Sequence, residues 1–127
     1  MLAVLMLLSS TMALAAGCCI VLGQRINSGR VQHNRFPGVR TAATIANEAA
    51  WAAGQRASLP YLRVWAWLFA GGSAAPLVVA VVSADVDASV TLALVVDLVV
   101  LLFALALAVP MVLASNRAAR VATASET

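Results

Sequence analysis

The chain has 127 residues, of which 63% are hydrophobic and only 10% are charged. This composition lies far outside the range of soluble globular domains and predicts a single membrane domain. All eight cations are arginines, and a net charge of +3 without a basic, aromatic-interleaved surface argues against a nucleic-acid partner.

The first predicted element is an apolar run from Leu2 to Leu22, which contains no charged residue. At about 1.5 Å per residue, a helix of this length crosses the roughly 30 Å hydrocarbon core of a bilayer. The run holds two adjacent cysteines, Cys18 and Cys19, whose position favours buried small side chains over a disulfide framework. Acylation of Cys18 at a lipoprotein-type cleavage site is the alternative, although no Lys or Arg precedes the run.

A polar segment follows over residues 23–63. It opens with the breaker-rich residues 24–29, which predict a loop. Further on, Phe36-Pro37-Gly38 predicts a tight turn, because proline fixes φ at the second position and glycine is free to adopt positive φ at the third. We therefore expect the chain to bend sharply within this loop.

Downstream of the turn, the loop is predicted to contain a short helix from Glu48 to Ser58. Asn47 is suited to be its N-cap, and Glu48 suits the positive end of the helix dipole. The alanine-rich run favours helix until Pro60 ends it. We expect this helix to lie at the membrane surface, with Trp51 facing the lipid headgroups.

Two further apolar spans are predicted over residues 64–82 and 90–113. The acidic connection between them is so short that the third span must return antiparallel to the second. The second span contains the small-residue run Gly71–Pro76, which lets another helix approach closely. Residues 114–127 form a polar tail that we expect to be disordered at its end.

The distribution of cations predicts how the spans cross the membrane. Residues 24–63 carry six arginines and one glutamate, the connection between the last two spans carries two aspartates and no cation, and the tail carries two arginines. Cytoplasmic loops collect Arg and Lys. The counts therefore predict an amino terminus outside the cell, and a polar loop and a carboxyl terminus in the cytoplasm.

Asp97 is the one ionisable side chain inside a predicted span, about 12 Å below the start of that span by helical rise. An ionised carboxylate at this depth costs on the order of 3 kcal/mol, so it should face the other helices, find a partner or stay protonated. Candidate partners are the hydroxyl side chains Ser9, Ser10, Thr11 and Ser73. This placement is compatible with two roles. One is a structural hydrogen bond to another helix or to a second copy of the protein, and the other is a site for a proton or a ligand.

The polar loop also carries an ordered series of residues, namely Asn34, Gly38, Arg40, Thr41, Thr44, Asn47, Glu48 and Trp51. This order, followed by two apolar spans, resembles the loop signature of the SdpI family of small bacterial membrane proteins, named for immunity to a sporulation-delay toxin. The resemblance implies a loop with a specific fold or a binding site, in the bacterial plasma membrane. It also implies a non-catalytic protein that protects against, or signals, a membrane-active peptide toxin.

Within this series, Arg40 and Glu48 are the strongest candidates for a functional pair. The guanidinium of Arg40 could reach Glu48 as a fixed fork, or it could hold a lipid phosphate instead. Three further arginines of the loop are expected to contact anionic lipid and orient the protein: Arg25, Arg30 and Arg35.

The sequence predicts no catalytic or metal centre. His33 is a lone histidine without a second histidine, cysteine or carboxylate at ligand spacing. No serine or cysteine nucleophile stands beside a base, and there are no paired carboxylates and no phosphate-binding glycine loop. We therefore expect neither enzyme activity nor a cofactor.

Together these patterns predict an all-α integral membrane protein, a three-helix bundle with a short interfacial helix in the first loop. Thin helices rich in alanine and valine bury little area between them. We therefore expect a homo-oligomer, or docking to a larger membrane protein, through the small-residue runs Gly71–Ala75 and Ala104–Ala108. Two alternative functions are a structural accessory subunit of a membrane enzyme or transporter, and a minimal proton-coupled transporter centred on Asp97.

Overall fold

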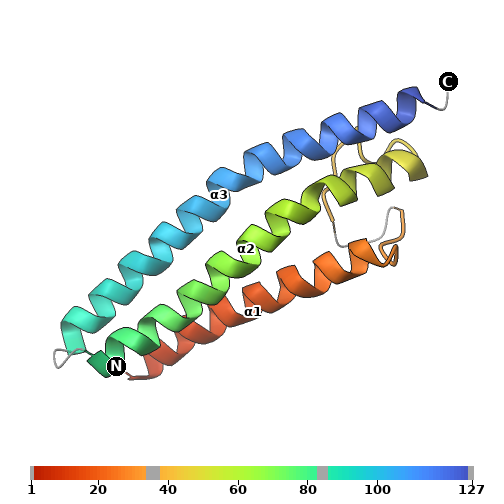
Figure 1. Ribbon diagram of the computed structural model, residues 1–127. Helices are drawn as coiled ribbons and strands as arrows, with labels where there is room; N and C mark the ends of the chain where they lie inside the picture. Colours follow the sequence, from red (N-terminus) through yellow and green to blue (C-terminus); the bar gives the residue numbers. More distant parts are fainter. Residues whose placement is uncertain (1, 34–37, 83–85, 126–127) are drawn as a thin grey trace. The chain divides into compact units, whose positions relative to one another are not determined.

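The computed structural model describes residues 2–33, 38–82 and 86–125, and all regular structure in these ranges is helical. Three long helices follow one another along the chain, α1 (Leu2–Asn27), α2 (Glu48–Val82) and α3 (Val86–Ala124) (Figure 1). Each contains a stretch long and apolar enough to cross a membrane: Ala3–Asn27, Glu48–Val79 and Asp87–Ala124. The predicted all-α class, with three helices able to span a membrane, is confirmed.

The prediction of a separate interfacial helix that ends at Pro60 is wrong. Helix α2 runs without a break from Glu48 to Val82 and includes both Pro60 and Pro76. A proline inside a helix removes one backbone hydrogen bond and costs about 3 kcal/mol. Ser58 and Leu62, on either side of Pro60, are both buried, with 1% and 5% of their surface exposed. Packing on both sides of the proline therefore holds this part of the helix together.

Helices α1 and α3 are longer than the apolar runs that predicted them. Helix α1 passes the expected end at Leu22 and reaches Asn27, and α3 continues through Pro110 to Ala124. In this last part of α3, Ser115 and Ala119 are fully buried. The predicted end of the third span at residue 113 is therefore too early, because a buried face keeps residues 114–124 of the polar tail in the helix. The end of the tail, for which disorder is expected, includes residues 126–127, which lie outside the described residues.

A glycine closely follows the end of helix α1 at Asn27. Gly29 has a φ of 68°, in the left-handed region that other residues rarely adopt. Its backbone N–H donates to the Ile26 carbonyl at 3.1 Å, and the N–H of Arg30 donates to the Arg25 carbonyl at 2.9 Å. These two bonds satisfy carbonyls of the last helical turn and form a Schellman motif. The motif ends the helix and begins the polar loop.

The three helices contribute to two compact units. Unit 1 comprises Met1–Cys19 and Val64–Leu105, and unit 2 comprises Ile20–Arg63 and Ala106–Thr127. All eight arginines of the sequence belong to unit 2, whereas the charged residues of unit 1 are three aspartates. Unit 1 is therefore the apolar part of the chain, and unit 2 contains the polar loop.

In unit 1, each helical segment buries one face and exposes large apolar side chains on the other. The buried positions follow the helical repeat; they are Leu5, Ser9, Met12 and Ala16 in α1, and Ser89, Ala93, Asp97 and Ala104 in α3. Helix α2 contributes Gly72, where an added Cβ atom would lie 3.5 Å from Cγ2 of Val100 and 3.8 Å from Cγ of Met12. The small residue thus brings segments of all three helices into contact.

Candidate functional site

Thr44, in unit 2, lies at the centre of the polar loop. Its side chain is fully buried, and its Oγ1 accepts a hydrogen bond from the backbone N–H of Thr41 at 2.9 Å and donates to the Val39 carbonyl at 2.9 Å. Thr41 Oγ1 in turn accepts from the N–H of Thr44 at 3.3 Å and bonds to Oδ1 of Asn116 in α3. Two threonines of the predicted signature therefore close a turn and attach it to α3.

Gln55 of α2 holds the other side of the same loop. Its Oε1 accepts from the Val39 N–H at 3.1 Å, and its Nε2 donates to the Val39 carbonyl at 2.9 Å. Gly38 lies against this amide with a φ of 154°, and a Cβ atom there would be 2.4 Å from Gln55 Oε1. Any larger residue at position 38 would displace the amide, which explains the glycine of the signature.

Trp51 is buried under the loop, with 1% of its surface exposed. Its indole Nε1 donates to the Val31 carbonyl at 3.1 Å, and the ring meets His33 edge to face, with centroids 5.9 Å apart. His33 Nε2 is 3.2 Å from the Ile45 carbonyl oxygen. The expectation that Trp51 faces the headgroups is therefore wrong, because the loop folds over the indole and supplies its hydrogen-bond acceptor.

Gly54 lies where α2 packs tightly against the loop. A Cβ atom at this position would lie 2.6 Å from Cγ2 of Thr44 and 3.3 Å from the Ser115 carbonyl oxygen. Helix α2, the loop and α3 therefore pack against one another at a point that has no room for a side chain.

Gly54→Ala should lower the free energy of unfolding by about 1 to 3 kcal/mol, the usual cost of overpacking. Thr44 cannot move away, because its hydroxyl is bonded within the loop. The measurement is SDS titration of the protein in mixed micelles, followed by circular dichroism. Gly71→Ala is the matched control, because nothing lies within 4 Å of a Cβ there. Equal effects of the two substitutions would contradict the packing described for Gly54.

The remaining residues of the signature lie around this core. Asn47 Oδ1 accepts from the Ala50 N–H at 2.7 Å, so the predicted N-cap of the helix that begins at Glu48 is confirmed. Arg40 and Glu48 are both exposed, and the functional pair that they form stays a prediction. Asn34 and the predicted turn at residues 36–37 lie outside the described residues.

A pocket of about 280 Å³ opens in unit 2 between the end of α1, the loop and α2. Its apolar wall includes Ile26 and Trp51, and its polar side chains are Gln32, His33, Glu48, Gln55 and Arg56. Glu48 and Arg56 are exposed, and neither has a hydrogen-bond or ion-pair partner among the described residues. Within the described ranges, no group of three or more His, Cys, Asp or Glu could hold a metal ion. The pocket is thus equipped to bind a polar group.

The carboxylate that is predicted to lie inside the membrane belongs to unit 1. Asp97 is 4% exposed, and both of its oxygens are buried without a hydrogen-bond partner in the described part of the chain. Three of the four candidate partners bond to a carbonyl of their own helix, Ser10 to Leu7, Thr11 to Leu8 and Ser73 to Ala70. The fourth, Ser9, is buried, and its hydroxyl also has no partner among the described residues.

Ser9 and Asp97 lie at about the same level of unit 1. Gly72 adjoins both Met12 of α1 and Val100 of α3. Ser9 precedes Met12 by three positions, and Asp97 precedes Val100 by three positions, which is about 4.5 Å of helical rise in each case. Because α1 and α3 run in the same direction (Figure 1), Ser9 and Asp97 are displaced from the level of Gly72 by the same distance and in the same direction. Ser9 is therefore the candidate partner that the structure leaves for Asp97.

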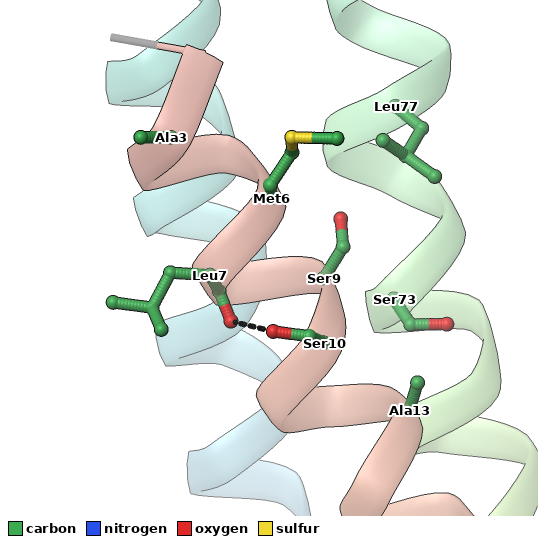
Figure 2. A pocket seen from close by; sticks show the side chains of 8 residues that line it. All are labelled: Ala3, Met6, Leu7, Ser9, Ser10, Ala13, Ser73 and Leu77. Carbon is green, nitrogen blue, oxygen red and sulfur yellow. Dashed lines mark hydrogen bonds between the residues drawn. The ribbon is translucent and has the colours of Figure 1, made fainter.

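A larger groove of about 700 Å³ lies in unit 1 between α1 and α2. Its lining is apolar apart from three hydroxyls; the residues are Ala3, Met6, Leu7, Ser9, Ser10, Ala13, Ser73 and Leu77. In Figure 2 the side chain of Met6 reaches from α1 toward Leu77 of α2, and Ser10 donates to the Leu7 carbonyl at 2.9 Å. The groove presents an apolar surface with few polar groups.

Comparison with known families matches residues 30–114, more than half of the chain, to the model described as the SdpI/YfhL protein family. The matched range includes the loop, its contacts on α2, and most of α3. No curated protein and no solved structure matches the chain. In the described part of the loop, Thr44 bonds to Thr41 and Val39, Thr41 bonds to Asn116 of α3, and Val31 accepts from Trp51 of α2. On the evidence of the family match, the chain belongs to the SdpI/YfhL family of membrane proteins.

Proposed function

We propose that this protein is a non-catalytic binding protein of the bacterial plasma membrane that protects against, or signals, a membrane-active peptide toxin. The observation that carries the proposal is the family match over residues 30–114, which spans the folded loop as well as two apolar helices. We infer that the protein binds its target without catalysis, because the buried polar side chains here form hydrogen bonds that hold the loop. Thr44 of the loop and Gln55 of α2 are examples.

Each of the two units, taken by itself, offers a surface that could bind such a peptide. The groove between α1 and α2 is lined mainly by apolar side chains and could bind the apolar face of a peptide dissolved in the bilayer. In unit 2 hydrogen bonds hold residues 39–44 of the loop, while Arg40, Glu48 and Arg56 are exposed on the loop or beside it. A segment held in this way is suited to recognition, because little conformational entropy is lost on binding.

The function is tested in a bacterial strain that lacks the protein. The strain should become hypersensitive to a membrane-active peptide, and expression of the wild-type chain should restore resistance. Trp51→Ala should fail to restore it, because the loop loses its buried anchor, whereas Trp67→Ala, at a site with 80% of its surface exposed, should succeed. Unchanged sensitivity of the deletion strain across a panel of such peptides would overturn the proposal.

For the orientation, we propose an external amino terminus and a cytoplasmic loop and carboxyl terminus, on the support of the cation distribution. In a background with Cys18 and Cys19 replaced by alanine, Ser28→Cys places a thiol at an exposed position of the loop. We expect a membrane-impermeant maleimide to label this thiol only after the cells are permeabilised. Ala88→Cys, exposed near the start of α3, should be labelled in intact cells. The opposite pattern would reverse the orientation.

A structural accessory subunit is the second candidate function. Gly71 is exposed, and nothing lies within 4 Å of a Cβ built on it, so a small-residue face of α2 stays open to another helix. Purification in mild detergent distinguishes the two candidates. A larger membrane protein that co-purifies at fixed stoichiometry favours the accessory role, and isolation without such a partner favours the binding protein.

A further inference from the structure

We propose that the pocket of unit 2 binds a zwitterionic phosphoethanolamine group, with its ammonium at Glu48 and its phosphate at Arg56. This binding would be separate from protection against a toxin. Both side chains line the pocket of about 280 Å³. This volume is just below the roughly 300 Å³ at which pockets for drug-sized ligands begin, so the pocket suits a small polar group.

The charges of the pocket select the class of ligand. Among the described residues that line it, Glu48 is the one carboxylate and Arg56 the one guanidinium, and neither is paired with another described residue. A simple anion would be attracted by the guanidinium of Arg56 but repelled by the carboxylate of Glu48. A simple cation would be attracted by Glu48 but repelled by Arg56. A ligand that carries both charges satisfies both side chains. Arginine binds phosphate as a two-pronged donor, and a carboxylate accepts hydrogen bonds from an ammonium.

The spacing of the two groups fits a short zwitterion. Glu48 and Arg56 are eight positions apart in α2, which corresponds to about 12 Å of helical rise between their backbones. Both side chains are long and line the same pocket, so their charged ends can approach a ligand from its two sides. The buried indole of Trp51 forms part of the wall, so its fluorescence can report on binding in the pocket.

The surroundings favour a lipid as the source of this group. Unit 2 carries all eight arginines and lies where the apolar parts of the helices give way to polar sequence, which is the composition typical of the headgroup region. Phosphoethanolamine occurs both as the headgroup of phosphatidylethanolamine and as a free metabolite. The chemistry at the pocket is the same in the two cases.

The test uses the full chain in neutral detergent with Trp65→Phe and Trp67→Phe, so that Trp51 is the only fluorescent indole. Phosphoethanolamine, ethanolamine and inorganic phosphate are titrated separately. We expect phosphoethanolamine to change the emission and to bind at least about tenfold more tightly than either half. Equal binding of inorganic phosphate, or no response to phosphoethanolamine together with no lipid preference, would overturn the proposal.

Charge variants assign the two contacts. Glu48→Gln and Arg56→Gln should each weaken phosphoethanolamine binding by about tenfold or more, in the range of one lost charged hydrogen bond. Arg117→Gln, which removes an exposed arginine outside the pocket lining, should leave binding unchanged. Because Glu48 is exposed, its replacement should not unfold the protein, and a thermal melt checks this. Loss of binding in Arg117→Gln, or unchanged binding in Glu48→Gln, would contradict the site.

A second arm identifies the source. The protein is reconstituted in vesicles of phosphatidylethanolamine mixed with phosphatidylglycerol, extracted, and analysed by native mass spectrometry. Retention of phosphatidylethanolamine in the wild-type protein, lost in Arg56→Gln, assigns the site to lipid. Tight binding of free phosphoethanolamine without any lipid preference assigns it to the soluble compound.

Discussion

Trp51→Ala is expected to lower the free energy of unfolding by about 3 to 5 kcal/mol, the usual cost of removing a large buried aromatic side chain. The indole is 1% exposed, contacts His33 and donates to the Val31 carbonyl. Its loss would leave a cavity beneath the loop and an unsatisfied backbone carbonyl. SDS titration in mixed micelles measures the change, and increased proteolysis between residues 28 and 47 would report release of the loop.

Two further tryptophan substitutions separate burial from hydrogen bonding. Trp51→Phe keeps most of the ring and loses the N–H donor, so it should cost about 1 kcal/mol. Trp67→Ala is the control, because Trp67 is 80% exposed and contributes little to packing within the chain. If Trp51 instead faced lipid headgroups, its truncation would have the small effect expected for Trp67.

The sequence was sufficient to predict the fold class and the number of apolar helices, because runs such as Leu2–Leu22 are long enough to cross a bilayer and contain no charge. The sequence was not sufficient to predict where these helices begin and end. Pro60 is a strong helix-stop signal, yet it lies inside α2, where Ser58 and Leu62 are buried. Whether packing outweighs a local signal depends on neighbours that are distant in sequence, and these become visible only in the structure.

The candidate site was predicted in part. Gly38, Thr41, Thr44 and Trp51 belong to the signature, and the structure shows them in the folded loop and its contacts. Their partners were missed, and these are Gln55, Gly54 and Asn116. Each of these residues lies on a helix, and its contacts can be predicted only when the element that packs against that helix is known. One signal was available: Gln55 is one turn after Trp51 and so shares its helical face.

Gln55→Leu is the second substitution for which we expect a large effect. It keeps much of the side-chain volume but removes both hydrogen bonds to Val39. The carbonyl of Val39 still accepts from Thr44, whereas its N–H loses the partner that the structure shows. The Val39 N–H is part-buried, and a donor shielded from water costs about 1 to 3 kcal/mol when it loses its partner. We expect a loss of unfolding free energy in the lower part of this range in the same SDS titration. Gln24→Leu, at an exposed position of α1, should change stability by less than about 0.5 kcal/mol.

A double-mutant cycle with Thr44→Val tests whether the two side chains act through the same backbone unit. Both bond to the Val39 carbonyl, and Thr44 also accepts from the N–H of Thr41. Because either substitution alone should loosen the loop, the double variant should lose less stability than the sum of the single variants, by about 0.5 kcal/mol or more. Strict additivity would mean that Gln55 and Thr44 hold the chain independently. In that case the loop would consist of two separately anchored segments. The contact of Gly38 with the Gln55 amide would then stabilise one segment, and the Thr41–Thr44 turn would stabilise the other.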